Sequence, residues 1–308
     1  MSLTSFLKYK DVKEKFKQEF PMPKFNLSGD LLAAPKTNHY IRMGIAFDYL
    51  MRFYLKRINR NAITGVWVAE VACAYAIKLI NDDKILKKII NILKDAKKIY
   101  SEYLKTGKMN DEVIKTCLLL APLDLFRRGL FIDPYIGTTN PRDIEDLKDL
   151  IKLVNPKEFK SRKICMLNPT FGKASTLVGG ADMDLLLDNA LIDIKTTKFL
   201  KLKRDYLNQL IGYYILFLIG GIDDAPPKAK VEFIGVYYSR HRLLYKIPIR
   251  EVVGKCDLQK FILWFKKRAK QAEKDPEKLR KITAAYDKLD AQLAEIRKQK
   301  GKLTKKRK

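Results

Sequence analysis

The stretch ADMDLLLDNALIDIKTTK, residues 181–198, brings Asp182, Asp184, Asp193 and Lys195 close together in the sequence. Because side chains alternate between the two faces of a strand, Asp182 and Asp184 should share one face, and Asp193 and Lys195 should share a face of the next strand. If the two strands pair through the short turn between them, the acids converge on one point. Paired carboxylates hold a hard divalent cation such as Mg²⁺, and a lysine beside it can stabilise charge on an attacked phosphate. The spacing therefore predicts a metal site with phosphate-ester chemistry.

The spacing Asp-x-Lys identifies no site by itself, because it recurs along the chain. Asp193 and Lys195 differ in their context: they lie in an apolar segment that follows a second one beginning Gly-Gly-x-Asp. The predicted helix that comes next carries Gln209 and Tyr213, which are four residues apart and so lie on one helical face. The other acid-x-Lys pairs begin at Asp11, Asp82, Asp95, Asp146 and Glu158.

Three short motifs, taken in order, resemble the RecB-like branch of the PD-(D/E)xK nuclease superfamily. They are GGAD (179–182), DIK (193–195) and QLIGY (209–213), where that branch shows Gly-x-x-Asp, (Asp/Glu)-x-Lys and Gln-x-x-x-Tyr. The resemblance covers about residues 165–250. It implies a metal-dependent phosphodiesterase that uses Mg²⁺ or Mn²⁺, built on a restriction-endonuclease-like mixed sheet flanked by helices.

The resemblance also implies a role for each motif residue. Asp182 and Asp193 are the expected metal ligands, with the Ile194 carbonyl as a possible third. Lys195 is the expected catalytic lysine. The residues expected to orient the site or to contact DNA are Gln209 and Tyr213.

Two of the ligand assignments have competitors. Asp184 competes with Asp182 because both should share a face, and the Gly-x-x-Asp spacing favours Asp182. Many members of the superfamily add a Glu or His from an upstream helix. Glu70, in the apolar run VWVAEVACAYA, is the first candidate for that ligand and His39 the second; the alternative for Glu70 is a partly exposed helix acid. The chain departs from the PD-(D/E)xK pattern at Ala181, where a proline is expected. It contains no GxxxxGK(S/T) sequence, the phosphate-binding loop of a helicase motor, so we expect no such motor within it.

The chain carries a large excess of positive charge. Lys and Arg number 62 against 35 Asp and Glu, which gives a net charge of +27. Such an excess favours a polyanionic partner, nucleic acid before an anionic membrane. The resemblance to the nuclease superfamily implies DNA rather than RNA. The alternative is a lysine-rich protein whose basic faces are merely solvated. The residues expected to contact phosphate are Lys198, Lys201, Lys203, Arg204, Arg240 and Arg242.

The pattern along the chain predicts an α/β protein with four parts. These are an N-terminal arm (1–40), a helical region (41–160), a nuclease-like core (161–255) and a basic helical extension (256–308). In the core, the order strand, strand, helix, strand is typical of an α/β arrangement. Within 276–299, apolar residues recur in steps of three and four, which suits a protein partner, self-association or packing back on the body.

No segment predicts insertion into a membrane. The longest nearly uncharged run, LIGYYILFLIGGI (210–222), is shorter than the roughly 18 residues that a spanning helix needs. The N-terminus shows no apolar region of a signal peptide. Four scattered cysteines predict reduced thiols and not a disulfide framework. We therefore expect a cytoplasmic protein.

The leading functional hypothesis is metal-dependent hydrolysis of DNA phosphodiesters, with Asp182 and Asp193 holding the ion and Lys195 stabilising the attacked phosphate. The alternative is a nucleic-acid-binding protein in which the acids are structural, or a subunit of a repair or defence complex on the same fold. Salt-sensitive DNA binding without metal-dependent cleavage would distinguish the second class from the first.

Overall fold

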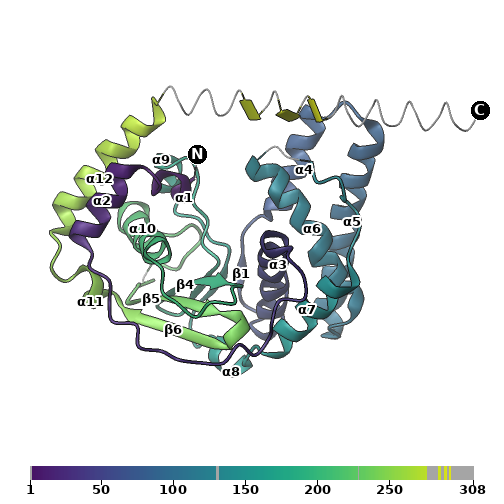
Figure 1. Cartoon of the computed structure of the whole chain (residues 1–308), viewed down its shortest axis with the longest axis horizontal. Helices are drawn as coiled ribbons and strands as arrows, with labels where there is room; N and C mark the ends of the chain where they lie inside the picture. The colour runs from purple at the N-terminus through teal and green to yellow at the C-terminus, as the bar shows by residue number, and fades with distance from the viewer. Residues whose placement is uncertain are drawn as a thin grey trace, which may run out of the picture.

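The centre of the molecule is a six-stranded mixed sheet in the order β1–β2–β3–β4–β5–β6 (Figure 1). β1 pairs with β2 and β4 with β5 in parallel, and the remaining neighbours are antiparallel. The predicted α/β class is therefore confirmed. The computed structural model describes residues 2–129, 132–227 and 229–275, with the pairs 284–285, 288–289 and 291–292. The strands are β1 (Ile63–Thr64), β2 (Cys165–Leu167), β3 (Leu185–Leu187), β4 (Ala190–Lys195), β5 (Phe233–Tyr238) and β6 (Leu243–Pro248).

Helices cover both faces of the sheet, because its central strands are apolar on both sides. Along β4, Ala190 and Ile192 pack in one core and Leu191 in the other, as the alternation of side chains requires. The first core is shared with α3 (Tyr40–Ile58), α4 (Val68–Leu79), α5 (Asp83–Thr106), α6 (Asp111–Gly129) and α7 (Pro141–Lys152). The second is shared with α1 (Leu3–Phe6), α2 (Lys10–Glu19), α10 (Arg204–Gly220) and α12 (Leu258–Glu273). Short connecting helices are α8 (Pro156–Phe159), α9 (Lys173–Leu177), η1 (Ser239–His241) and α11 (Ile249–Val253).

Local signals in the sequence set the ends of several helices. α5 begins after Asp82, whose side chain accepts a hydrogen bond from the Ile85 amide, and ends at Gly107 with φ of 70°. An N-cap acid and a left-handed C-terminal glycine are favoured at these positions. α7 begins with Pro141 at its first position after the cap residue Asn140, where proline is favoured because its missing amide hydrogen is not needed there.

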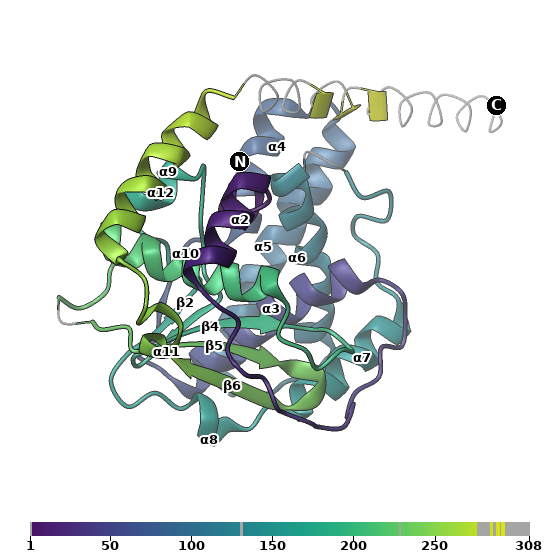
Figure 2. The same cartoon turned by 60° about the vertical axis from the view of Figure 1, so that its left-hand side comes forward.

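The N-terminal arm is partly helical and partly extended. Residues 2–19 form α1 and α2, which pack in the core beside α10 and α12. Residues 20–39 then cross the edge of the sheet without regular secondary structure and reach α3 (Figure 2). Hydrogen bonds fix this crossing: the amides of Leu32 and Ala33 donate to the Arg240 carbonyl, and Thr37 donates to Asp143 of α7. The arm therefore ties the β5–β6 turn to the first helical group.

Two features depart from a simple division into segments. β1 comes from within the predicted helical region, yet it pairs with β2 of the core, so the two regions share one sheet. Leu289, in the predicted C-terminal seam, is buried with the first helical group, while most of 276–299 lies outside the described residues. No helix in the part of the chain that the structure describes is long and apolar enough to cross a membrane.

Candidate active site

The pairing of β3 with β4 brings two of the aspartates together. Leu185 lies opposite Ile192, so one further step of the same antiparallel register places Asp184 opposite Asp193. Asp184 also accepts a hydrogen bond from the Ile194 amide, with 2.6 Å between Oδ2 and N. The two carboxylates are thereby fixed by backbone pairing and not by flexible loops.

Two of the three sequence motifs, DIK and QLIGY, meet through Lys195. Its Nζ lies 2.6 Å from Asp193 Oδ2 and donates to Gln209 Oε1 at 3.0 Å. Gln209 in turn donates from Nε2 to the Tyr213 hydroxyl at 2.9 Å. Leu191, Asp193 and Lys195 alternate along β4 and so lie on one face of the strand. Because Leu191 packs in the core beside α10, Asp193 and Lys195 also face α10. The structure therefore places these four predicted residues in one contact network.

Asp182 lies apart from this network. β3 begins only at Leu185, so the alternation that should put Asp182 and Asp184 on one face does not extend back to residue 182. Asp182 instead forms an isolated bridge with Thr170, and its Oδ2 lies 3.7 Å from Arg128 Nη2 on α6. Its side chain is 34% exposed, against 3% for Asp193. Of the two competing acids, Asp184 is the one that the β3–β4 register sets beside Asp193, and Asp182 faces α6.

Two helices supply acids and arginines that the sequence reasoning missed. Asp48 and Arg52 form an ion pair one turn apart on α3, with 2.7 Å between Oδ2 and Nη2. Asp124 and Arg128 form the equivalent pair on α6. A charged pair at i,i+4 inside an otherwise apolar helix, DYLMR at 48–52 and DLFRR at 124–128, is the signal that could have found them.

Crowding of these charges changes the ionisation of the site. Burial raises the pKa of Asp184 well above its ordinary value, and the neighbouring Asp193 and Asp48 raise it further. Burial also raises the pKa of Asp48, although Arg52 opposes the effect. Burial alone would lower the pKa of Lys195, but Asp193 and Asp184 outweigh it and leave that pKa raised. Lys195 is therefore an ammonium at neutral pH, while burial and the neighbouring acids favour the protonated form of Asp184.

The oxygen donors of these carboxylates are of the type that binds a hard divalent cation. The buried Asp48 Oδ1 makes no hydrogen bond within the described ranges, which is costly unless a cation lies close to it. Asp193 Oδ2 has the Lys195 ammonium at 2.6 Å. Carboxylate oxygens are the ligands that Mg²⁺ and Mn²⁺ prefer. Among the residues that the structure describes, no three His, Cys, Asp or Glu side chains converge as a ready-made metal site. The donors are of the right type, and Lys195, Arg52 and Arg128 now neutralise them.

A cleft of about 960 Å³ lies at the side of the cluster formed by Asp182 and Arg128, and Asp184, Asp193 and Lys195 are not among the residues that line it. Its walls come from α1, α4, the end of α6, the loop after β2 and the segment before β3. Asp182 and Arg128 line it. A phosphate in the cleft would meet Arg128, while in the Lys195 network Asp193 is 3% exposed and Lys195 is 21% exposed.

Glu70 and His39, the expected upstream ligands, point elsewhere. Glu70 accepts a hydrogen bond from Lys97 of α5, with 2.7 Å between Oε2 and Nζ, and also accepts from the Trp67 amide at the start of α4. His39 lies 2.9 Å from the buried Asp143. The expectation for Glu70 is corrected accordingly, because its carboxylate serves the packing of α4 on α5. The helix acid that the structure places beside Asp184 is Asp48.

The residues expected to contact phosphate divide into two groups. Arg240 is 1% exposed and makes two hydrogen bonds to Asp146, so the expectation of a surface phosphate contact is corrected for it. Arg204 is half-buried and donates to the Phe20 carbonyl at 2.6 Å, which ties α10 to the arm. The remaining four side chains are exposed: Lys198, Lys201, Lys203 and Arg242.

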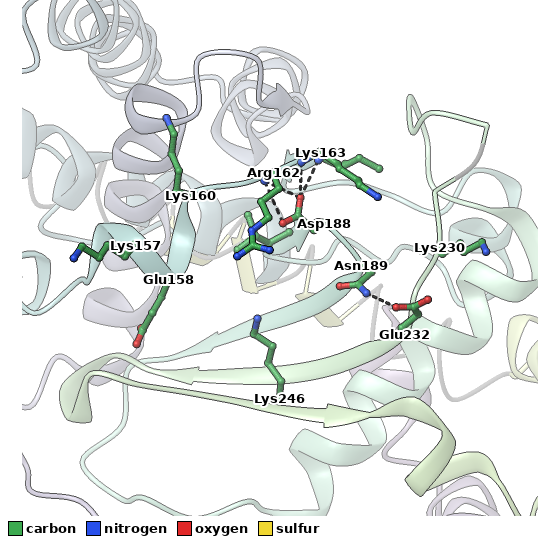
Figure 3. Close-up of a pocket in the computed structure, with 12 residues that line it drawn as sticks. Lys157, Glu158, Lys160, Arg162, Lys163, Asp188, Asn189, Lys230, Glu232 and Lys246 are labelled. Carbon is green, nitrogen blue, oxygen red and sulfur yellow. Dashed lines mark hydrogen bonds between the residues drawn. The ribbon is translucent and has the colours of Figure 1, made fainter.

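A basic cavity, separate from that cleft, lies at the other end of β4, around the β3–β4 turn (Figure 3). Its volume is about 700 Å³, and Figure 3 shows Arg162 and Lys246 pointing toward its centre. Asp188 in this cavity is turned toward the backbone, where it accepts from the amides of Arg162, Lys163 and Ile164. The cavity is a second concentration of positive charge, remote from Lys195. Its basic residues are Lys157, Lys160, Arg162, Lys163, Lys230 and Lys246.

The chain matches no protein-family model, and comparison with curated proteins and with solved structures yields no match.

Proposed function

We propose that this protein is a metal-dependent nuclease with a restriction-endonuclease-like core, and that DNA is its substrate. The observation that carries the proposal is the network of Asp193, Lys195, Gln209 and Tyr213, with Asp184 opposite Asp193. A lysine held between a buried carboxylate and an amide, beside further acids, is an arrangement suited to phosphodiester hydrolysis. The net charge of +27 favours a polyanionic substrate.

The carboxylates and Lys195 have different roles in the proposed reaction. Asp193 and Asp184 would hold Mg²⁺ or Mn²⁺, with Asp48 or Asp182 completing the carboxylate set. When bound, such an ion supplies a Lewis acid and a water of lowered pKa. Lys195 donates hydrogen bonds toward the negative charge that develops on the phosphate.

The remaining polar residues position the reacting groups. Gln209 holds the Lys195 ammonium in place, and the Tyr213 hydroxyl accepts from Gln209 and fixes its amide. Arg128, which lines the cleft, binds a phosphate oxygen of the incoming strand. Each of these roles requires only the rotamers that the hydrogen bonds already fix.

A cleavage assay tests the proposal on linear, circular and single-stranded DNA, with Mg²⁺, with Mn²⁺ and with a chelator. We expect metal-dependent cleavage by the parent and its loss, by about 10²-fold or more, in Asp193→Asn and Lys195→Ala. Glu70→Gln is the matched control, since it removes an acid that lies outside the network. Equal melting temperatures establish that all variants fold. Absence of metal-dependent cleavage by the parent, or equal rates in the network variants, would overturn the proposal.

A second candidate is a nucleic-acid-binding protein in which the acids are structural. It is favoured by the ion pairs of Lys195, Arg52 and Arg128, which already neutralise part of the cluster. In this case the same assay shows salt-sensitive DNA binding but no cleavage with either metal.

A further inference from the structure

A groove of about 670 Å³ lies between the β4–α10 loop and the N-terminal arm. Phe199 is 57% exposed at this groove, and Leu31 of the arm is 40% exposed. The lining contains no Asp or Glu among the described residues. Its cationic side chains, all exposed, are Lys198, Lys201 and Lys203. The groove therefore combines an apolar floor with a positive rim.

Contacts connect this groove to Lys195. The Lys195 Nζ lies 4.9 Å from the centre of the Tyr206 ring, and Lys203 Nζ lies 5.5 Å from the same ring. Lys203 Nζ is also 5.8 Å from the Phe199 ring, and Lys198 Nζ is 5.2 Å from it. Cations and aromatic rings thus alternate without interruption from the proposed catalytic lysine to the exposed ring of Phe199.

Nucleic acid offers a partner for both the lysines and the aromatic rings of this groove. Phosphates are bound by lysines without regard to sequence, and the flat face of a base stacks on an exposed aromatic ring. An acidic peptide would satisfy the lysines but would leave the face of Phe199 uncovered. Phe199 follows Lys195 by four residues, a span of at most about 14 Å, so a base stacked there lies within a few nucleotides of a phosphate at Lys195.

We infer that Phe199 is a stacking platform for an unpaired base, and that the strand acted on enters the site single-stranded along Lys198, Lys201 and Lys203. The inference rests on the proposed function and adds the class of substrate. Inside a duplex, both faces of each base are covered by its neighbours, so away from a duplex end only an unpaired or extruded base can stack on Phe199.

Binding measured in chelator separates this inference from catalysis. Fluorescence anisotropy of the full-length protein with a labelled single-stranded oligothymidylate gives the affinity, and a blunt duplex of the same length gives the reference. We expect Phe199→Ala to weaken single-strand binding by about 5-fold to 100-fold, because stacking of one base is worth roughly 1–3 kcal/mol. Duplex binding should change by less than 2-fold, and Phe199→Trp should retain single-strand affinity.

Controls keep each outcome interpretable. Leu263→Ala removes a 68% exposed apolar side chain from the basic helix α12 and should leave single-strand affinity unchanged. If Phe199→Ala and the parent bind single strands equally, or if duplex binding falls as much, the inference is overturned while metal-dependent cleavage by the parent can still stand. If the parent binds neither nucleic acid, both the inference and the proposed function fail.

Discussion

The ammonium of Lys195 lies 2.6 Å from Asp193 Oδ2, on the face of β4 that packs against α10. This contact neutralises one carboxylate of the cluster, while Asp184 on the neighbouring strand remains without a cationic side chain in hydrogen-bond contact in the described part of the chain. A divalent cation and the Lys195 ammonium therefore compete for the same oxygen. That competition distinguishes a lysine that serves a metal site from one that only balances buried charge.

Lys195→Ala should bind Mn²⁺ at least as tightly as the parent, although it no longer cleaves DNA. Removal of the ammonium leaves two neighbouring carboxylates uncompensated, which favours a bound cation. Asp193→Asn should instead weaken Mn²⁺ binding by about tenfold or more, because it removes a ligand. Titration calorimetry of the full chain measures both. Weaker binding by Lys195→Ala than by the parent would mean that the lysine holds the cluster together structurally.

Asp48→Asn should also weaken Mn²⁺ binding, by roughly 10-fold to 100-fold, because Asp48 raises the negative charge around Asp184 and has a buried oxygen without a hydrogen bond. Glu70→Gln provides the comparison, since it changes a carboxylate that pairs with Lys97. The same calorimetric titration applies. Equal losses in the two variants would indicate that general electrostatics, and not position, governs the affinity.

Much of the candidate site could be predicted because its parts are close in the sequence. Asp193 and Lys195 lie on one strand, and Gln209 lies on the helix that follows it, so a local motif suffices to bring them together. The sequence predicts that Asp182 and Asp184 share a face near Asp193 and favours Asp182 as the ligand. In the structure β3 begins at Leu185, and the register places Asp184 opposite Asp193. That boundary is set by pairing with β2 and cannot be read from alternation alone.

The remaining parts depend on distant packing. Asp48 and Asp124 come from helices that reach the sheet only through tertiary contacts, so no local spacing links them to Asp184. Arg240 lies in a turn, where a solvent-exposed side chain is the ordinary expectation. It is buried because the arm covers the turn and Asp146 of α7 supplies a partner, neither of which is near in sequence.

The buried pair of Arg240 and Asp146 should dominate local stability. Arg240→Met leaves the Asp146 carboxylate buried without its partner, and we expect the free energy of unfolding to fall by about 3–5 kcal/mol. The double variant Arg240→Met/Asp146→Leu should lose less, because no uncompensated charge remains. Urea denaturation measures both, with the exposed Arg242→Met as a control expected within about 0.5 kcal/mol of the parent. A loss under 1 kcal/mol for Arg240→Met would contradict the burial of this pair.

Asp188 should make stability depend on pH in the acid range. Burial alone would raise the pKa of Asp188, but hydrogen bonds from the amides of Lys163, Ile164 and Arg162 outweigh it and lower that pKa. A folded-state pKa below the unfolded value of about 3.9 stabilises the fold above that pH, and the stabilisation disappears as pH falls through the folded pKa. Asp188→Asn should therefore be less stable at pH 7, by about 1 kcal/mol, and should lose less on acidification. Denaturation series between pH 7 and pH 3 test this, and parallel curves for the two proteins would contradict it.

Two sets of three lysines allow the groove at Phe199 to be distinguished from overall charge. Substituting Lys198, Lys201 and Lys203 by Gln should reduce the slope of log affinity against log salt for single-stranded DNA by about 2, since each phosphate contact contributes roughly 0.7. The same change in net charge is made at the cavity of Figure 3 by substituting three of its exposed lysines by Gln. That second variant should keep the slope within about 0.5 of the parent, because charges beyond the Debye length of about 8 Å are screened at physiological salt. Equal slopes in the two variants would show that net charge alone binds the strand. The lysines substituted in the second variant are Lys157, Lys230 and Lys246.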